Sequence, residues 1–87
     1  MAKRVKKLEK GIESLKNEIE EHFAKIDSDI EEKNFDFGKY HVREIGKSLL
    51  VALEHKIDLL GADKKYAELV KSYKSRLEEY KKKLSMG

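Results

Sequence analysis

The chain contains no cysteine, proline, tryptophan, glutamine or threonine, and asparagine occurs only at Asn17 and Asn34. Without cysteine there is no disulfide and no thiolate for catalysis or metal binding. Without proline, no residue forces a helix to end. No apolar run is long enough to be a signal peptide or a membrane span. We therefore expect a cytoplasmic protein that has no contact with a membrane.

Charged residues make up most of what remains, at 43% of the sequence. A composition rich in lysine and glutamate and poor in thermally labile side chains is typical of heat-adapted proteins, which predicts a thermophilic, archaeal source. The 20 basic residues nearly balance the 17 acidic ones, which leaves a net charge of +3. A charge this small permits contact with nucleic acid but does not indicate it.

The length of 87 residues predicts one domain that spans residues 1–87. A chain of this size buries only about 60–65% of its unfolded surface, so its core is thin. Hydrophobic burial alone rarely stabilises so small a domain. The remaining stability must come from backbone hydrogen bonds, from ion pairs or from a second copy of the chain.

The first third of the sequence carries one apolar stripe with steps of three and four residues, the period of an α-helix. The stripe consists of Val5, Leu8, Ile12, Leu15, Ile19, Phe23, Ile26 and Ile30. It predicts a long helix over about residues 3–33. The sequence at 27–29, Asp-Ser-Asp, leaves open whether that helix is continuous or restarts.

Two further helices are predicted, over residues 37–60 and 63–85. The first is the most apolar stretch, and its face is wide enough for two neighbouring helices, with Gly46 where one of them can come close. Gly61 is suited to the left-handed residue that ends it. Phe35 or Phe37, in the turn before it, is expected to close one end of the core. The third helix has a regular seam of Tyr66, Val70, Tyr73, Leu77, Tyr80 and Leu84.

Together these patterns predict an all-α fold, an antiparallel up-down-up three-helix bundle with a long first helix. In that topology the start of the first helix and the start of the third lie at the same end of the bundle. Basic residues gather there and could bind phosphate groups of RNA or DNA without sequence preference. This basic pole consists of Lys3, Arg4, Lys6, Lys7, Lys10, Lys56, Lys64 and Lys65.

No catalytic, cofactor-binding or metal-binding residue is predicted. His22 follows Glu18 and His41 precedes Glu44 on shared helical faces, but further inward carboxylates of a metal-binding bundle are missing. The triplet at 46–48, Gly-Lys-Ser, resembles the end of a phosphate-binding loop, yet it lies inside a helix and lacks the earlier glycine. No cofactor is therefore expected, and the chain is not expected to be an enzyme.

A surface for protein partners is the favoured prediction. The first helix should extend beyond the other two, so that part of its stripe lacks cover within the chain. The exposed part is either Val5 and Leu8 or the segment with Phe23, Ile26 and Ile30, while Tyr40 and Val51 are predicted to share an outer face of the central helix. The predicted function is a non-enzymatic helical module that forms a homodimer or binds another helical protein. Nucleic-acid binding through the basic pole is the alternative.

Overall fold

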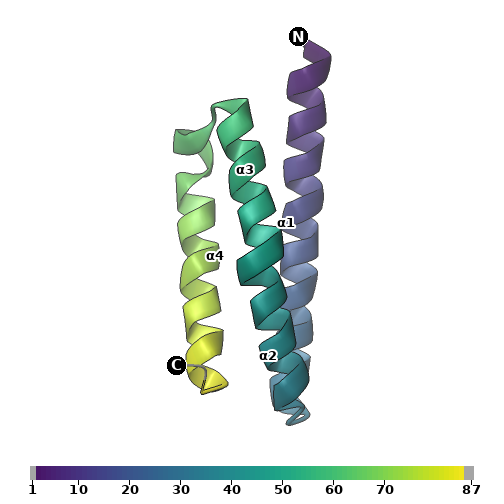
Figure 1. Ribbon diagram of the computed structural model, residues 1–87, viewed down its shortest axis with the longest axis vertical. Helices are drawn as coiled ribbons and strands as arrows, with labels where there is room; N and C mark the ends of the chain where they lie inside the picture. The colour runs from purple at the N-terminus through teal and green to yellow at the C-terminus, as the bar shows by residue number, and fades with distance from the viewer. Residues whose placement is uncertain (1, 86–87) are drawn as a thin grey trace.

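The computed structural model describes residues 2–85, with side chains from residue 5 onward. Helix α1 (Ala2–Glu31) is followed by a rod made of α2 (Phe35–Glu44), η1 (Ile45–Leu49) and α3 (Leu50–Leu60), and then by α4 (Asp63–Lys83). Figure 1 shows α1 and α4 parallel to one another and antiparallel to the α2–α3 rod. This arrangement confirms the predicted all-α, up-down-up bundle. Within residues 2–85, no helix has both the length and the apolar character that crossing a membrane requires.

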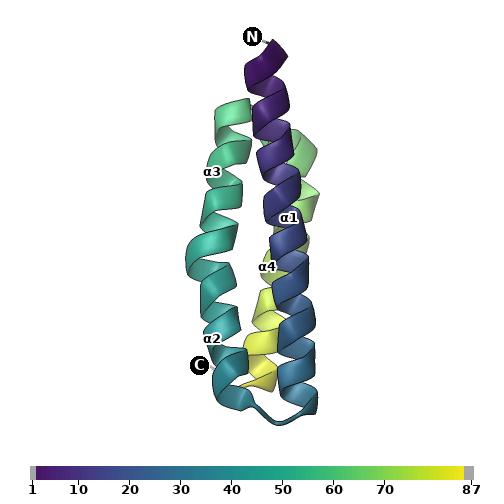
Figure 2. The same ribbon diagram turned by 90° about the vertical axis from the view of Figure 1, so that its right-hand side faces the viewer.

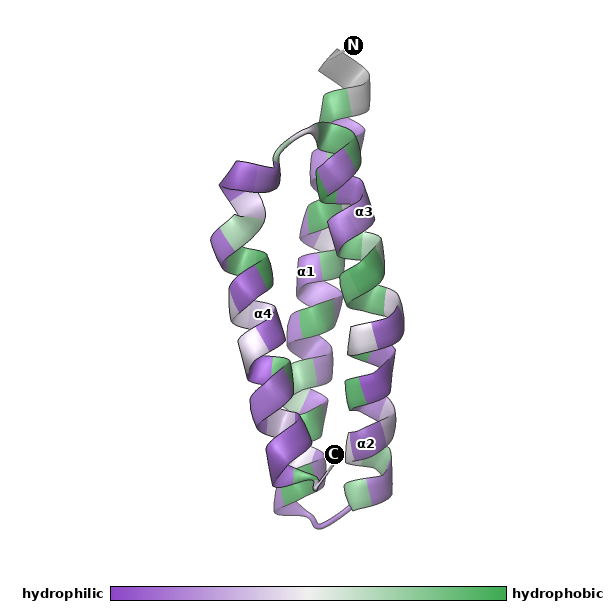
Figure 3. Ribbon diagram, turned by 60° about the vertical axis from the view of Figure 1, so that its left-hand side comes forward, coloured by the Kyte–Doolittle hydropathy of each residue, from purple (hydrophilic) through white to green (hydrophobic). Residues whose placement is uncertain are grey.

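The core runs along the whole bundle because each helix turns one apolar stripe inward. Hydrophobic and hydrophilic residues alternate around each helix (Figure 3), as expected for amphipathic helices. The first helix is continuous to Glu31, so the sequence at 27–29 does not interrupt it. The buried side chains are Ile12, Ile19, Phe23, Ile26, Val42, Ile45, Leu50, Leu53, Ile57, Tyr73, Leu77, Tyr80 and Leu84.

A π-helical turn, η1, lies in the middle of the central rod, where the sequence predicts only regular α-helix. The buried hydrophobic side chains of the rod are Val42, Ile45, Leu50, Leu53 and Ile57, with steps of three, five, three and four residues. A five-residue step on an α-helix would rotate the later residues away from the core by about 100°. The wider π turn takes up the additional residue and keeps both halves of the stripe facing inward.

The turns between helices agree with the sequence in one respect and differ in another. Gly61 ends α3 with φ of 71°, the left-handed conformation that was predicted. The prediction that an aromatic ring closes the core at the α1–α2 turn is wrong. Phe35 and Phe37 are 45% and 64% exposed, because both lie in the first turn of α2 on its outer side.

The first helix extends beyond its neighbours at its N-terminal end only. With 30 residues against 21 in α4, α1 rises past the α3–α4 turn in two perpendicular views (Figures 1 and 2). Val5 is 43% exposed there, and Leu8 is half-buried. At the other end, Phe23 and Ile26 are fully buried under the rod and α4, so an uncovered segment from Phe23 onward is contradicted.

Candidate interaction groove and polar sites

One side of α4 is fixed to α1 by aromatic contacts. The Phe23 ring stacks on Tyr80 with 5.5 Å between centroids and packs against Tyr73 at 5.9 Å. The Arg76 guanidinium lies over the other side of this cluster, 4.2 Å from the Phe23 centroid, a favourable cation–π position. Tyr73 and Tyr80 therefore belong to the packing seam between α4 and α1.

Polar contacts reinforce the same side. Arg76 donates to the Glu20 carboxylate at 3.1 Å, and the Tyr80 hydroxyl donates to Asp27 at 2.7 Å. Burial raises the pKa of Tyr73 to about 12, with a further contribution from the negative charge of Glu20. Burial also raises the pKa of Tyr80, and its hydrogen bond to Asp27 acts in the same direction. Both phenols stay protonated at neutral pH and act as donors.

The other side of α4 borders a groove. Two adjoining hollows follow α4 between it and the α2–α3 rod, and Lys74 lines both of them. Their volumes are about 510 and 490 Å³. A single ion pair within residues 5–85 bridges this side, from Lys74 Nζ to the Glu54 carboxylate at 2.9 Å. The groove therefore extends along α4 from Asp63 to Lys81, and one ion pair bridges it.

The floor of the groove is apolar at the end nearer the C-terminus of α4. Val42, Leu50 and Leu77 lie there with 1–5% exposure. A methyl group on Gly46 would sit 3.3 Å from Cδ2 of Leu77, so α4 approaches the rod closely at this point. The predicted role of Gly46 as the point of close approach is confirmed, and its lysine neighbour, Lys47, lies on the groove wall.

The walls of the groove carry opposite charges at its two ends. We call the end lined by Arg43, Lys47, Lys74, Lys81 and Glu78 the basic half. We call the end lined by Glu54, Asp58, Asp63, His55 and Lys74 the acidic half. The basic half has four cationic groups and one carboxylate, whereas the acidic half has three carboxylates and one lysine. The sequence shows these charges only as scattered exposed residues, because the groove depends on which side of α4 meets the rod.

The two exposed apolar residues predicted to share an outer face lie on different sides of the rod. Val51 is 56% exposed and lines the acidic half of the groove. Tyr40 is also 56% exposed, but its hydroxyl donates to Glu44 beside α1. The reason is η1, which lies between them. Its additional residue places Val51 about 100° around the rod from the direction that an uninterrupted α-helix would give. A common Tyr40–Val51 surface is therefore contradicted.

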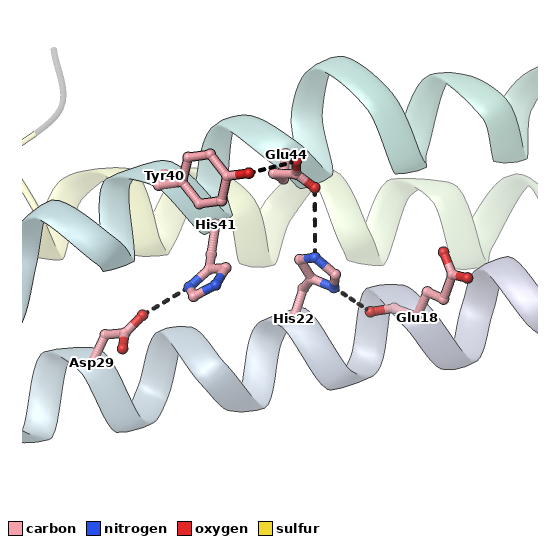
Figure 4. A network of polar contacts seen from close by, with 6 residues as sticks. All are labelled: Glu18, His22, Asp29, Tyr40, His41 and Glu44. Carbon is pink, nitrogen blue, oxygen red and sulfur yellow. Dashed lines mark hydrogen bonds and ion pairs between the residues drawn. The ribbon is translucent and has the colours of Figure 1, made fainter.

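A polar network joins α1 to α2 on the side away from the groove (Figure 4). His41 Nδ1 lies 2.8 Å from the Asp29 carboxylate. His22 Nδ1 lies 2.8 Å from the backbone carbonyl oxygen of Glu18, and its Nε2 lies 3.7 Å from Glu44. Since a carbonyl oxygen only accepts, His22 Nδ1 must carry a proton.

The histidine network connects α1 to α2 and serves the stability of the fold. The two imidazole rings meet edge to face, with 5.7 Å between their centroids. No group of three or more metal-ligating side chains converges within the part of the chain that the structure describes. The sequence pairs each histidine with a carboxylate on its own helix, whereas the side-chain partners of His22 and His41 lie across the interface, at Glu44 and Asp29. Pairs of this kind can be predicted only when the register between the two helices is known.

The basic pole is solvated. Lys6, Lys7 and Lys10 are exposed on the overhang of α1, and Lys64 and Lys65 are exposed at the start of α4. None of these five forms an ion pair within residues 5–85. Lys56 differs, because its aliphatic chain packs over Gly11, where an added methyl group would meet it at 3.1 Å. The side chains of residues 3 and 4, Lys3 and Arg4, lie outside the described part.

The groove, the histidine network and the basic pole are thus three separate features. The network connects helices of this chain, whereas the groove and the pole face solvent. Protein-family models, curated proteins and solved structures gave no match to this chain. The groove and the basic pole, which face solvent, are therefore the candidates for function.

Proposed function

We propose that this chain is a non-enzymatic helical interaction module that associates with a second copy of itself. The observation that carries the proposal is the groove between α4 and the α2–α3 rod, which has an apolar floor and charged walls. In a two-fold dimer the same surface of both copies forms the contact. Placing this groove against the groove of a second copy would bury more apolar surface than the three helices bury alone.

The absence of enzymatic activity is part of the proposal, and the pattern of shifted pKa values supports it. Catalytic sites concentrate strongly shifted groups in a cleft. Here the pKa values that depart from their usual range belong to Tyr40, Tyr73, Tyr80 and Arg76. None of these residues lines the groove. The groove walls carry charged side chains of both signs, which suit recognition of a charged partner surface.

The proposed setting is the cytoplasm of a heat-adapted, archaeal organism. The composition supports it through its 43% of charged residues and the absence of cysteine, glutamine and threonine. A chain with a thin core would benefit from association at high temperature, since a bound partner stabilises the folded state by mass action.

Sedimentation velocity across the micromolar concentration range tests the proposal. We expect the mass to rise from 10.2 kDa towards twice that value as concentration increases. Because a dimer dissociates with dilution, the midpoint of thermal unfolding should fall as the concentration is lowered over the same range. A mass of 10.2 kDa at every concentration contradicts self-association.

Nucleic-acid binding through the basic pole is a second candidate. It is supported by five exposed lysines that form no ion pair with any side chain of residues 5–85. Duplex DNA should bind weakly, with an affinity that falls steeply as salt rises. Replacing Lys6, Lys7 and Lys10 with glutamine should lower the salt slope by about 0.9 for each lysine that contacts phosphate.

The matched control replaces an equal number of exposed lysines elsewhere, at Lys25, Lys71 and Lys82, with glutamine. Fluorescence anisotropy with labelled duplex measures both variants over a salt series. Loss of binding in the first variant and not in the second supports the candidate. Equal binding by the wild type and the first variant dismisses it.

A further inference from the structure

We infer that the groove is a two-fold symmetric interface in which two copies of this chain lie antiparallel. This inference rests on the proposed self-association and names the surface that carries it. The partner is a second copy because the charge pattern of the groove is complementary to itself when reversed, whereas a uniformly charged helix from another protein would match one half and be repelled by the other.

The charge argument follows from symmetry. Most homodimers are related by a two-fold axis, so each contact occurs twice. The two-fold axis lies in the plane of the interface, perpendicular to the helices, and crosses the groove at its middle. Rotation about this axis places the partner's groove opposite and reverses the direction of its helices. The basic half, with Arg43 and Lys47, then faces the partner's acidic half, with Glu54 and Asp58. The same opposition occurs again on the other side of the axis, so all four halves are matched.

Residues where the acidic half adjoins the basic half suit a position near the axis, where each side chain lies close to its own copy. Val51 is 56% exposed and Val70 is half-buried, so both can be covered by apolar atoms of the partner. Lys74 lies in both halves, but its ammonium group is already paired with Glu54 at 2.9 Å. Two copies of Lys74 therefore introduce no unpaired charge at the centre.

The contact has the length that a stable dimer requires. The groove is lined along α4 from Asp63 to Lys81, about 27 Å at 1.5 Å per residue. Stable interfaces bury about 800 Å² on each partner, which calls for contact along most of a groove of this length. The histidine network and the aromatic cluster lie on other sides of the bundle, so formation of the dimer leaves the intramolecular contacts of the fold intact.

Charge reversal in complementary variants tests the inference. The basic-half variant carries Arg43→Glu and Lys47→Glu, and the acidic-half variant carries Glu54→Lys and Asp58→Lys. Each variant alone would oppose like charges at both contacts, so we expect its dimer to dissociate at least about tenfold more readily than the wild type. An equimolar mixture restores opposite charges at both contacts, and we expect a heterodimer with wild-type affinity.

Matched controls change the net charge by the same amount outside the groove, through Lys6→Glu with Lys7→Glu and through Glu31→Lys with Glu32→Lys. Both controls should form homodimers like the wild type. Circular dichroism establishes that each variant is folded, and the neutral pair Arg43→Gln with Lys47→Gln replaces the basic-half variant if that variant is not. Native mass spectrometry of isotopically labelled mixtures counts homodimers and heterodimers.

The possible outcomes separate the inference from the function on which it rests. Preferential heterodimers in the mixed groove variants, with unaffected controls, establish the interface. A wild-type dimer whose affinity the groove variants leave unchanged overturns the interface but not self-association. A wild type that stays monomeric across the micromolar range overturns both.

Discussion

Replacing Phe23 with alanine is expected to reduce the free energy of unfolding by about 3–5 kcal/mol, the range for large-to-small changes at buried aromatic positions. The side chain has 0% exposure and contacts two tyrosines and the Arg76 guanidinium. Its removal leaves a cavity between α1 and α4, where no other aromatic residue of α1 can fill the space. Domains are typically stable by only about 5–15 kcal/mol, so the variant should be close to unfolded at ambient temperature.

The control is the same substitution at Phe37, which is 64% exposed on the outer side of α2. A surface change of this kind is expected to alter the free energy of unfolding by no more than about 0.5 kcal/mol. Urea unfolding followed by circular dichroism measures both variants at a fixed chain concentration, because association would otherwise change the comparison. Similar losses at the two positions would show that the aromatic cluster does not hold α4 to α1.

The periodicity of the sequence was sufficient to predict the helices, because each stripe reports which side of a helix avoids water. The stripe from Val5 to Ile30 predicted a first helix that ends within two residues of its observed end at Glu31. The seam from Tyr66 to Leu84 likewise predicted the buried side of α4. Local patterns of this kind depend on the chain's own helical period and need no information about neighbours.

The candidate site could not be predicted in the same way, because it depends on the register between helices. Lys47 and Asp58 are ordinary exposed ions in the sequence, and only the close approach at Gly46 indicates a neighbouring helix. The contact between Glu44 and His22 is a second example, since their separation of 22 residues has no helical meaning. The π turn η1 was not predictable either, because the sequence offers Leu49 at four residues from Ile45 as well as Leu50 at five, and only the structure shows that Leu50 is the buried one.

The five-residue step between Ile45 and Leu50 leads to a second prediction with a large effect. It compares the stability of two variants, each of which lacks one exposed polar residue inside a helix. Deleting Ser48 from η1 should leave the protein folded, with a change in the free energy of unfolding of about 1 kcal/mol or less. The buried hydrophobic side chains of the rod would then follow one another at steps of three, four, three and four residues, the period of a regular α-helix. The π turn would be lost without rotating either half of the stripe.

Deleting Asn17 from α1 should have the opposite result, because α1 contains no additional residue to lose. Ile12 and Leu15 would turn by about 100° relative to Ile19 and Phe23, and only one of these pairs could face the core. Leaving a buried isoleucine or leucine without its contacts costs about 2–5 kcal/mol, so the deletion should unfold the N-terminal half of α1 or the whole chain. Urea unfolding distinguishes the two deletions. If deleting Ser48 is as damaging as deleting Asn17, then η1 is needed for its own geometry, as a feature of the groove, and not as an accommodation of one additional residue.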